Sequence, residues 1–216
     1  VYIAFEPYQG SGGTDNILMI SNANDRTPTY DATKGNSQRK LAPLGSDMVL
    51  AYAHEGRVYA AISSNGGADW HASELLSQVD YSGATRHIDH PASYPSLVAS
   101  DSCVYAVWQA KTTPESSEYM LMCRRLLCND INVSEVLDSA HASTSSGPEG
   151  IRPVITRYNI GGTMTLVIVY QGHDGLYKTT KPESGGSWSI PAKIEGTSAT
   201  SANPSLAATS THEVLA

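Results

Sequence analysis

The octet Ser63-Ser64-Asn65-Gly66-Gly67-Ala68-Asp69-Trp70 is the most informative segment of this chain, and it directly follows an alternating stretch at residues 57–62. Asn, Gly and Asp favour a tight turn in which glycines take positive φ, and the aromatic that ends the octet is expected to fold back under the turn. A second octet, Lys181-Pro182-Glu183-Ser184-Gly185-Gly186-Ser187-Trp188, follows a similar stretch at residues 175–180. A strand, a Gly-Gly turn and a Trp that recur in the same order predict a repeat architecture.

Both octets resemble the Asp-box of the sialidase (BNR-repeat) superfamily, Ser-x-Asp-x-Gly-x-Thr-Trp. The first octet places five residues on that pattern, with Asn for the Asp and Asp for the Thr: Ser63, Asn65, Gly67, Asp69 and Trp70. The second places four, with Lys181 where the Ser belongs: Glu183, Gly185, Ser187 and Trp188. The resemblance implies a β-propeller in which the box is a structural turn between the third and fourth strands of a blade, away from the active site.

The composition favours a packed all-β domain. The chain has 216 residues, of which 40% are hydrophobic, with 18 Gly, 11 Pro and 12 Tyr against a single Phe. Such a chain is long enough for a core and suits short strands and tight turns. The net charge of −7 and the absence of a Lys/Arg-rich run argue against nucleic acid or an anionic membrane as a partner. No apolar stretch approaches the roughly 18 residues needed for a membrane span, and we expect neither a metal nor a cofactor.

The three cysteines and the ends of the sequence give information on the cellular compartment in which the protein resides. Cys103, Cys123 and Cys128 are compatible with one disulfide and one free thiol, or with three buried thiols. The sequence begins with neither a Met nor a signal peptide, so we expect a mature or excised segment. The family resemblance, the many Ser and Thr residues and the low Lys content predict a secreted or cell-surface protein.

Strand-like segments recur along the whole chain. Four prolines, Pro43, Pro95, Pro153 and Pro204, are expected to mark the first strand of each repeat, at intervals of about 50 residues. Four strands per repeat predict a single propeller domain, or a fragment of one, over residues 1–216, with blades near 1–40, 41–90, 91–150 and 151–200 and a partial repeat at 201–216. No segment shows a sustained helical period, so helices should be absent or trivial.

The two ends of the chain leave two arrangements open. Residues 1–5 and 214–216 both fit the second strand of a blade. Either the ring closes with about four blades of four antiparallel strands, which would remove exposed strand edges, or the chain is a slice of a larger array, since sialidase-like propellers usually have about six blades.

Candidate functional residues fall in the loops that a propeller places on one face, around the mouth of its channel. These are the loops between the second and third strands and the segments that lead into each first strand. We expect ligands to bind there, at positions that include Arg86, His54, His173, Asp174 and Trp108. Trp108 is a candidate for stacking on a sugar ring or for the core, and the pair 173–174 is a candidate for a ligand contact or a tight turn.

The densest cluster is Arg86-His87-Ile88-Asp89-His90. Imidazoles and a carboxylate at this spacing suit a metal or acid–base catalysis, but no paired motif supports these roles, and we favour a hydrogen-bonded polar loop. The resemblance to sialidases implies three Arg residues that clamp a carboxylate, a Tyr nucleophile and an Asp acid. In Ile151-Arg152-Pro153 the Arg adjoins the Pro instead of standing two residues before it, and the other Arg residues form no such triad.

Two functions therefore compete. The first is a non-catalytic module that binds a glycan or a protein and uses the propeller as a scaffold. The second is a sialidase-like, glycan-cleaving enzyme whose candidate catalytic residues are Asp89, His87, His90, Glu149 and Arg152. We favour the binding module, because the Asp-boxes are present and the catalytic Arg set is not evident.

Overall fold

The structure is a computed structural model. It describes residues 4–10, 13–19, 40–71, 74–77, 79–80, 87–88, 91–113, 115–127, 135–138, 150–201, 203–208 and 213–215. These residues form strands, turns and loops. They contain no helix, and therefore none that could cross a membrane. The expectation of an all-β fold with antiparallel pairing is confirmed.

Three four-stranded antiparallel sheets carry most of the described residues. The first contains β3 (Leu41–Leu44), β4 (Asp47–His54), β5 (Arg57–Ser63) and β6 (Glu74–Leu75). The second contains β9 (Ala92–Ala99), β10 (Val104–Lys111), β11 (Tyr119–Leu126) and β12 (Glu135–Asp138). The third contains β13 (Val154–Ile160), β14 (Thr163–Gln171), β15 (Leu176–Pro182) and β16 (Ala192–Lys193). In each sheet the strands lie side by side in chain order, so every sheet is a meander.

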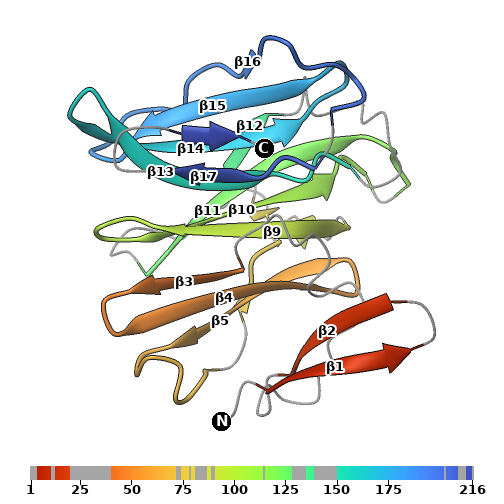
Figure 1. Cartoon of the computed structure of the whole chain (residues 1–216), viewed down its shortest axis with the longest axis vertical. Coiled ribbons are helices and arrows are strands. Elements are labelled where there is room, and N and C mark those ends of the chain that lie inside the picture. The colour runs from red at the N-terminus through yellow and green to blue at the C-terminus, as the bar shows by residue number, and fades with distance from the viewer. Residues whose placement is uncertain are drawn as a thin grey trace.

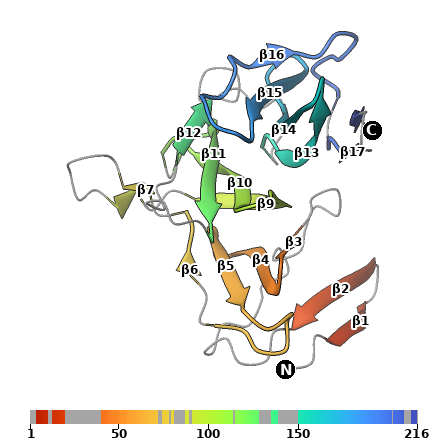
Figure 2. The same cartoon turned by 90° about the vertical axis from the view of Figure 1, so that its left-hand side faces the viewer.

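Three two-stranded sheets complete the described strands. They are β1 (Ala4–Gly10) with β2 (Gly13–Met19), β7 (Val79–Asp80) with β8 (His87–Ile88), and β17 (Leu206–Ala208) with β18 (Glu213–Leu215). The four-stranded sheets are stacked along the long axis of the molecule, with the β1–β2 hairpin at one end and the third sheet at the other (Figures 1 and 2). The described strands do not close into a ring, so the four-bladed closed propeller is not confirmed.

The stacking follows from the apolar pattern of the middle strands. Successive side chains of a strand point to opposite faces of its sheet, and β10 is buried on both. Its residues Ala106 and Trp108 pack against the first sheet, whereas Tyr105 and Val107 pack against the third. In β14 the same alternation packs one face against the second sheet and the other against β17. A strand that is apolar on both faces must be covered on both, which accounts for the stack.

The prolines do not all mark equivalent positions. Pro153 directly precedes β13, whereas Pro95 is the fourth residue of β9, after Ala92 and Ser93 have already paired with β10. Pro43 instead pairs with Met48, beside the turn that ends β3. The expectation that Pro43 and Pro95 mark the starts of their strands is therefore wrong. Pro43 is tolerated there because β3 is the edge strand of its sheet.

Candidate functional site

The loops that contain the candidate residues lie at one edge of the stack, which we call the loop edge. It is formed by the β4–β5, β10–β11 and β14–β15 loops and by the segments that lead into β9 and β13. Backbone hydrogen bonds join these parts: Ala92 N–H donates to Gly56 O at 2.6 Å, and Gln171 N–H donates to Ile151 O at 2.8 Å. The opposite edge, the turn edge, contains the β3–β4, β9–β10 and β13–β14 turns and both octets.

The residues directly before Pro95, Pro153 and Pro204 share the same backbone distortion, and the first two of these residues lie at the loop edge. The residue directly before a proline has a left-handed backbone in each case, with φ of 54° at Tyr94, 45° at Arg152 and 55° at Asn203. In β9 this conformation accompanies a bulge, because the register with β10 shifts opposite Tyr94 and Pro95. A positive φ at a non-glycine residue is unfavourable, and residues in such conformations cluster at functional sites. Its recurrence makes the loop edge the candidate site.

Gln109 connects three segments at this edge. It lies near the end of β10 and is 1% exposed. Its Oε1 accepts a hydrogen bond from Arg152 N–H at 2.9 Å, and its Nε2 donates to Ser93 Oγ at 3.0 Å. Gly150 packs directly against the same amide. A single buried side chain thus joins the start of β9 to the segment that leads into β13.

The guanidinium of Arg152 lies over the ring of Tyr94, with Cζ 5.3 Å from the ring centre. Such a cation–π contact contributes on the order of 0.5–2 kcal/mol and fixes the direction of the side chain. Arg152 is half-buried, so part of it reaches solvent. The arrangement places a positive, planar, hydrogen-bonding group at the loop edge, a group suited to carboxylates and other anions.

The first sheet is tied to β9 by a lysine. Lys40 Nζ donates to Pro95 O at 2.6 Å. Burial lowers the pKa of Lys40 from 10.5 to about 7, because its charged form is poorly solvated there. The bond anchors the distorted start of β9 from the side opposite Arg152.

His54 and Glu55 lie at the β4–β5 hairpin. His54 is nearly buried, with its ring 6.4 Å from that of Tyr59 and its Nε2 3.8 Å from Glu55 Oε2. Glu55 and Gly56 both have positive φ, as a two-residue hairpin loop requires. His54 is therefore packed within its own sheet, with little surface left for a ligand.

His173 and Asp174 lie in the β14–β15 loop and are partly exposed. Asp174 accepts hydrogen bonds from Lys193 Nζ and from the hydroxyl of Tyr177, both at 2.9 Å. The bond from Lys193 and then that from Tyr177 lower the pKa of Asp174 below its usual value of 3.8. These two hydrogen bonds connect the loop to β15 and β16. They favour the interpretation of the pair 173–174 as a tight turn over a role in ligand contact.

Trp108 belongs to the core. It is fully buried between the first and second sheets, so it offers no face on which a sugar ring could stack. The corresponding positions in the other two sheets hold Tyr52 and Tyr170, and each of these stacks on the tyrosine opposite it, at 5.6 and 6.0 Å between ring centres. Aromatic side chains here pack the sheets together.

Several sequence candidates cannot be placed. Arg86, Asp89, His90 and Glu149 lie outside the described residues. His87 begins β8, of which the structure describes the backbone alone. Among the described residues, no group of three or more His, Cys, Asp and Glu is arranged to hold a metal ion.

The structure brings Arg152 together with Tyr94, Ser93 and Gln109, none of which sequence reasoning assigned to a site with it. An aromatic-Gln pair occurs at 108–109 and again at 170–171, which marks Gln109 as a repeated position but does not indicate its partner.

The first octet forms a hydrogen-bonded turn after β5. Ser63 Oγ accepts from Gly67 N–H at 2.9 Å and donates to Asn65 Oδ1 at 3.0 Å, while Asp69 N–H donates to the same Oδ1 at 2.8 Å. Gly67 has a φ of 90°, and a Cβ there would lie 3.2 Å from Met48 Sδ. These residues shape the turn edge and lie far from Arg152 along their strands.

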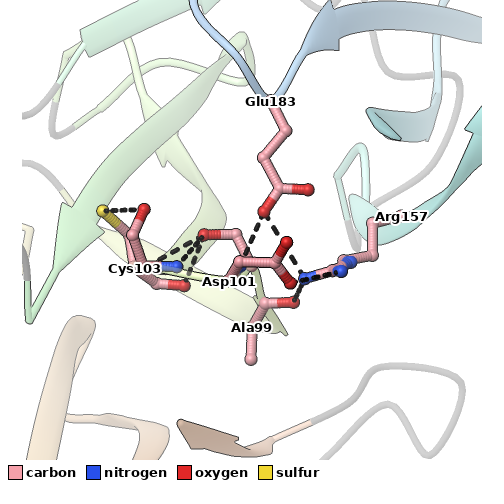
Figure 3. A network of polar contacts seen from close by, with 7 residues as sticks. Ala99, Asp101, Cys103, Arg157 and Glu183 are labelled. Atoms are coloured by element: carbon pink, nitrogen blue, oxygen red, sulfur yellow. Dashed lines mark hydrogen bonds and ion pairs between the residues drawn. The ribbon is translucent and has the colours of Figure 1, made fainter. Parts of the chain in front are cut away.

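The second octet is organised differently. Glu183 reaches out of its turn to the second sheet, where Asp101 N–H donates to its Oε1 at 2.7 Å (Figure 3). Arg157 of β13 lies 3.4 Å from the same oxygen through Nη1 and 2.7 Å from Asp101 Oδ1 through Nη2. Glu183 thus joins two sheets, whereas the corresponding Asn65 organises its own turn.

The cysteines differ in state. Cys103 is disulfide-bonded, and Cys123 is a buried free thiol. Cys128 lies outside the described residues. Of the two arrangements that the sequence left open, the structure agrees with one disulfide and one free thiol.

Comparison with known proteins gives a distant likeness to carbohydrate-active enzymes. A NanB sialidase from Streptococcus pneumoniae is 14% identical, with 77% of this chain and 25% of that chain covered and a TM-score of 0.43. A xylan β-1,4-xylosidase from Bacillus halodurans is 14% identical, with 80% and 35% covered and a TM-score of 0.44. A mutant Trypanosoma rangeli sialidase displaying trans-sialidase activity is 12% identical, with 86% and 40% covered and a TM-score of 0.31.

The chain spans between a quarter and two fifths of the length of these proteins. The sequence matches no family model and no curated protein. A likeness at these scores does not assign the chain to a family, so its function must be argued from its own residues.

Proposed function

We propose that this chain is a sialidase-like β-propeller, or part of one, that binds a glycan or a protein ligand at its loop edge and serves as a non-catalytic scaffold outside the cell. The observation that carries the proposal is Arg152, held in a left-handed backbone directly before Pro153 with its guanidinium over Tyr94. The same distortion occurs at Tyr94, which also lies at the loop edge, and at Asn203 before Pro204. A fixed, partly exposed cation favours a ligand that carries an anionic group.

Two further observations support the proposal. The stacked four-stranded meanders have the strand order of propeller blades, with the first strand of each sheet next to the following sheet. The disulfide at Cys103 favours an oxidising compartment, which supports a secreted or cell-surface location.

A binding module and an enzyme make different demands on the loop edge. An enzyme needs an acid and a base within hydrogen-bond reach of one reacting centre, whereas a binding module needs only a shaped polar surface. The alternative function is therefore that of a glycosidase. Its acid, its base and its anion-binding group would come from Asp89, His87, His90, Glu149 and Arg152.

A glycan array combined with turnover assays on fluorogenic glycosides separates the two. We expect glycan binding that Arg152→Gln weakens, with no turnover and no effect of Asp89→Ala on binding. Turnover that Asp89→Ala abolishes while the fold is intact would establish the enzyme. If binding is unchanged in Arg152→Gln, the ligand binds elsewhere than at the loop edge.

A further inference from the structure

We propose that Gln109 is a positioning residue that fixes the direction of Arg152, the residue on which the proposed function rests. Gln109 does not face the ligand, because it is 1% exposed. It acts through the Arg152 backbone N–H, which donates to its Oε1 at 2.9 Å. Gln109 and Arg152 are 43 positions apart in the sequence, and Gln109 belongs to β10 whereas Arg152 lies in the segment that leads into β13.

A carboxamide suits this position because it has both a donor and an acceptor. The acceptor takes the Arg152 N–H, and the donor binds Ser93 Oγ at 3.0 Å. Ser93 directly precedes Tyr94, and the guanidinium of Arg152 lies over the ring of Tyr94. The two hydrogen bonds of one amide thus hold both halves of the cation–π pair.

Gly150 makes room for this amide. A Cβ at position 150 would lie 2.3 to 2.7 Å from the amide atoms of Gln109, and φ there is 84°. Real side chains do not tolerate such contacts, and a left-handed backbone at this position favours glycine. The segment that leads into Arg152 is therefore shaped around Gln109.

The consequence for Arg152 is conformational. A φ of 45° is unfavourable for an Arg and persists only where the surroundings impose it. When the Gln109 acceptor is lost, we expect the Arg152 backbone to relax to negative φ and its guanidinium to leave the Tyr94 ring.

The first test is independent of any ligand. Proton NMR of the full chain is expected to show ring-current shifts of the Arg152 Hδ protons in the wild type, and their loss in Tyr94→Leu. We expect Gln109→Leu and Gly150→Ala to reduce these shifts by at least half. Gln109→Glu keeps an acceptor for the Arg152 N–H, and Ser93 Oγ can donate to its other oxygen, so this variant should retain more of the shifts than Gln109→Leu. Ser63→Ala removes buried hydrogen bonds at the turn edge and is the control for general destabilisation. Shifts that are the same in Gln109→Leu and the wild type would overturn the proposal.

The second test measures affinity for 3′-sialyllactose, with lactose as the matched neutral probe. Loss of a preorganised contact is expected to weaken binding of the acidic probe about tenfold in Gln109→Leu, with Ser63→Ala unchanged. If Arg152→Gln weakens this binding and Gln109→Leu does not, the role of Gln109 is wrong and the proposed function stands. If the wild type binds the two probes equally, the proposal that the ligand carries an anionic group is wrong. The NMR shifts then still test the role of Gln109.

Discussion

Asn65 and Asp69, the two residues at which the first octet departs from the Asp-box pattern, are hydrogen-bonded to each other. Asn65 Nδ2 donates to Asp69 Oδ2 at 2.9 Å, and Asp69 N–H donates back to Asn65 Oδ1 at 2.8 Å. The pattern has Asp and Thr at these positions. The Asn supplies a donor that an ionised Asp lacks, and the Asp at 69 provides its acceptor. The two departures therefore compensate for each other.

This pairing predicts a coupled effect on stability. Asn65→Asp alone places two carboxylates side by side and removes the donor, which should lower the free energy of unfolding by about 1 kcal/mol. Asn65→Asp together with Asp69→Thr restores the Asp-box residues and should recover most of that loss. Urea denaturation of the two single variants and the double variant measures the coupling. Strictly additive losses would show that the two residues act independently.

The network between the second and third sheets predicts a larger effect. The side chain of Glu183 is 11% exposed and lies beside Arg157, so Arg157→Leu leaves a nearly buried carboxylate without its cation. Breaking one half of such a pair should cost roughly 2–4 kcal/mol. Arg157→Leu combined with Glu183→Leu should recover much of this loss. Asp101→Asn is the matched control, because the Asp101 side chain is 80% exposed and its pair with Arg157 should contribute less than about 1 kcal/mol.

Lys40 predicts a pH dependence of stability. The folded protein releases its proton near pH 7, and the unfolded chain holds it up to the ordinary pKa of 10.5. Between these values the unfolded state binds more protons, so this group makes the folded state more stable as the pH rises. Lys40→Met should remove that slope when denaturation is measured at pH 6.5 and 9.0. An unchanged difference between the two pH values would contradict the low pKa of Lys40.

The cysteines predict a specific peptide map. Cys103 is disulfide-bonded and Cys123 is free, which leaves Cys128 as the remaining cysteine of the sequence. Non-reducing mass spectrometry should find a peptide that joins Cys103 to Cys128, with Cys123 alkylated only after unfolding. A peptide that links Cys123 would show a different pairing.

The sequence predicted what local patterns determine. Alternation in residues 57–62 matches β5, and the turn residues of the first octet form the turn that follows it, because both depend on neighbouring residues. The position of Pro43 was predicted wrongly, since spacing alone does not distinguish the start of an edge strand from its end.

The site was less accessible to sequence reasoning. Arg152 was a candidate, but its support by Gln109 depends on a hydrogen bond between residues 43 positions apart. No local pattern encodes such a contact. Trp108 was a ligand candidate because aromatics bind sugars, and its burial depends on the sheet that packs over it.

Hydrogen–deuterium exchange of the full chain with and without 3′-sialyllactose shows which edge of the stack binds the ligand. If a ligand binds at the loop edge through Arg152, the amides of residues 92–96 and 150–154 should exchange more slowly in its presence, and those of residues 63–70 at the turn edge should not change. Protection confined to the turn edge, or the same protection of residues 150–154 in Arg152→Gln as in the wild type, would contradict the account.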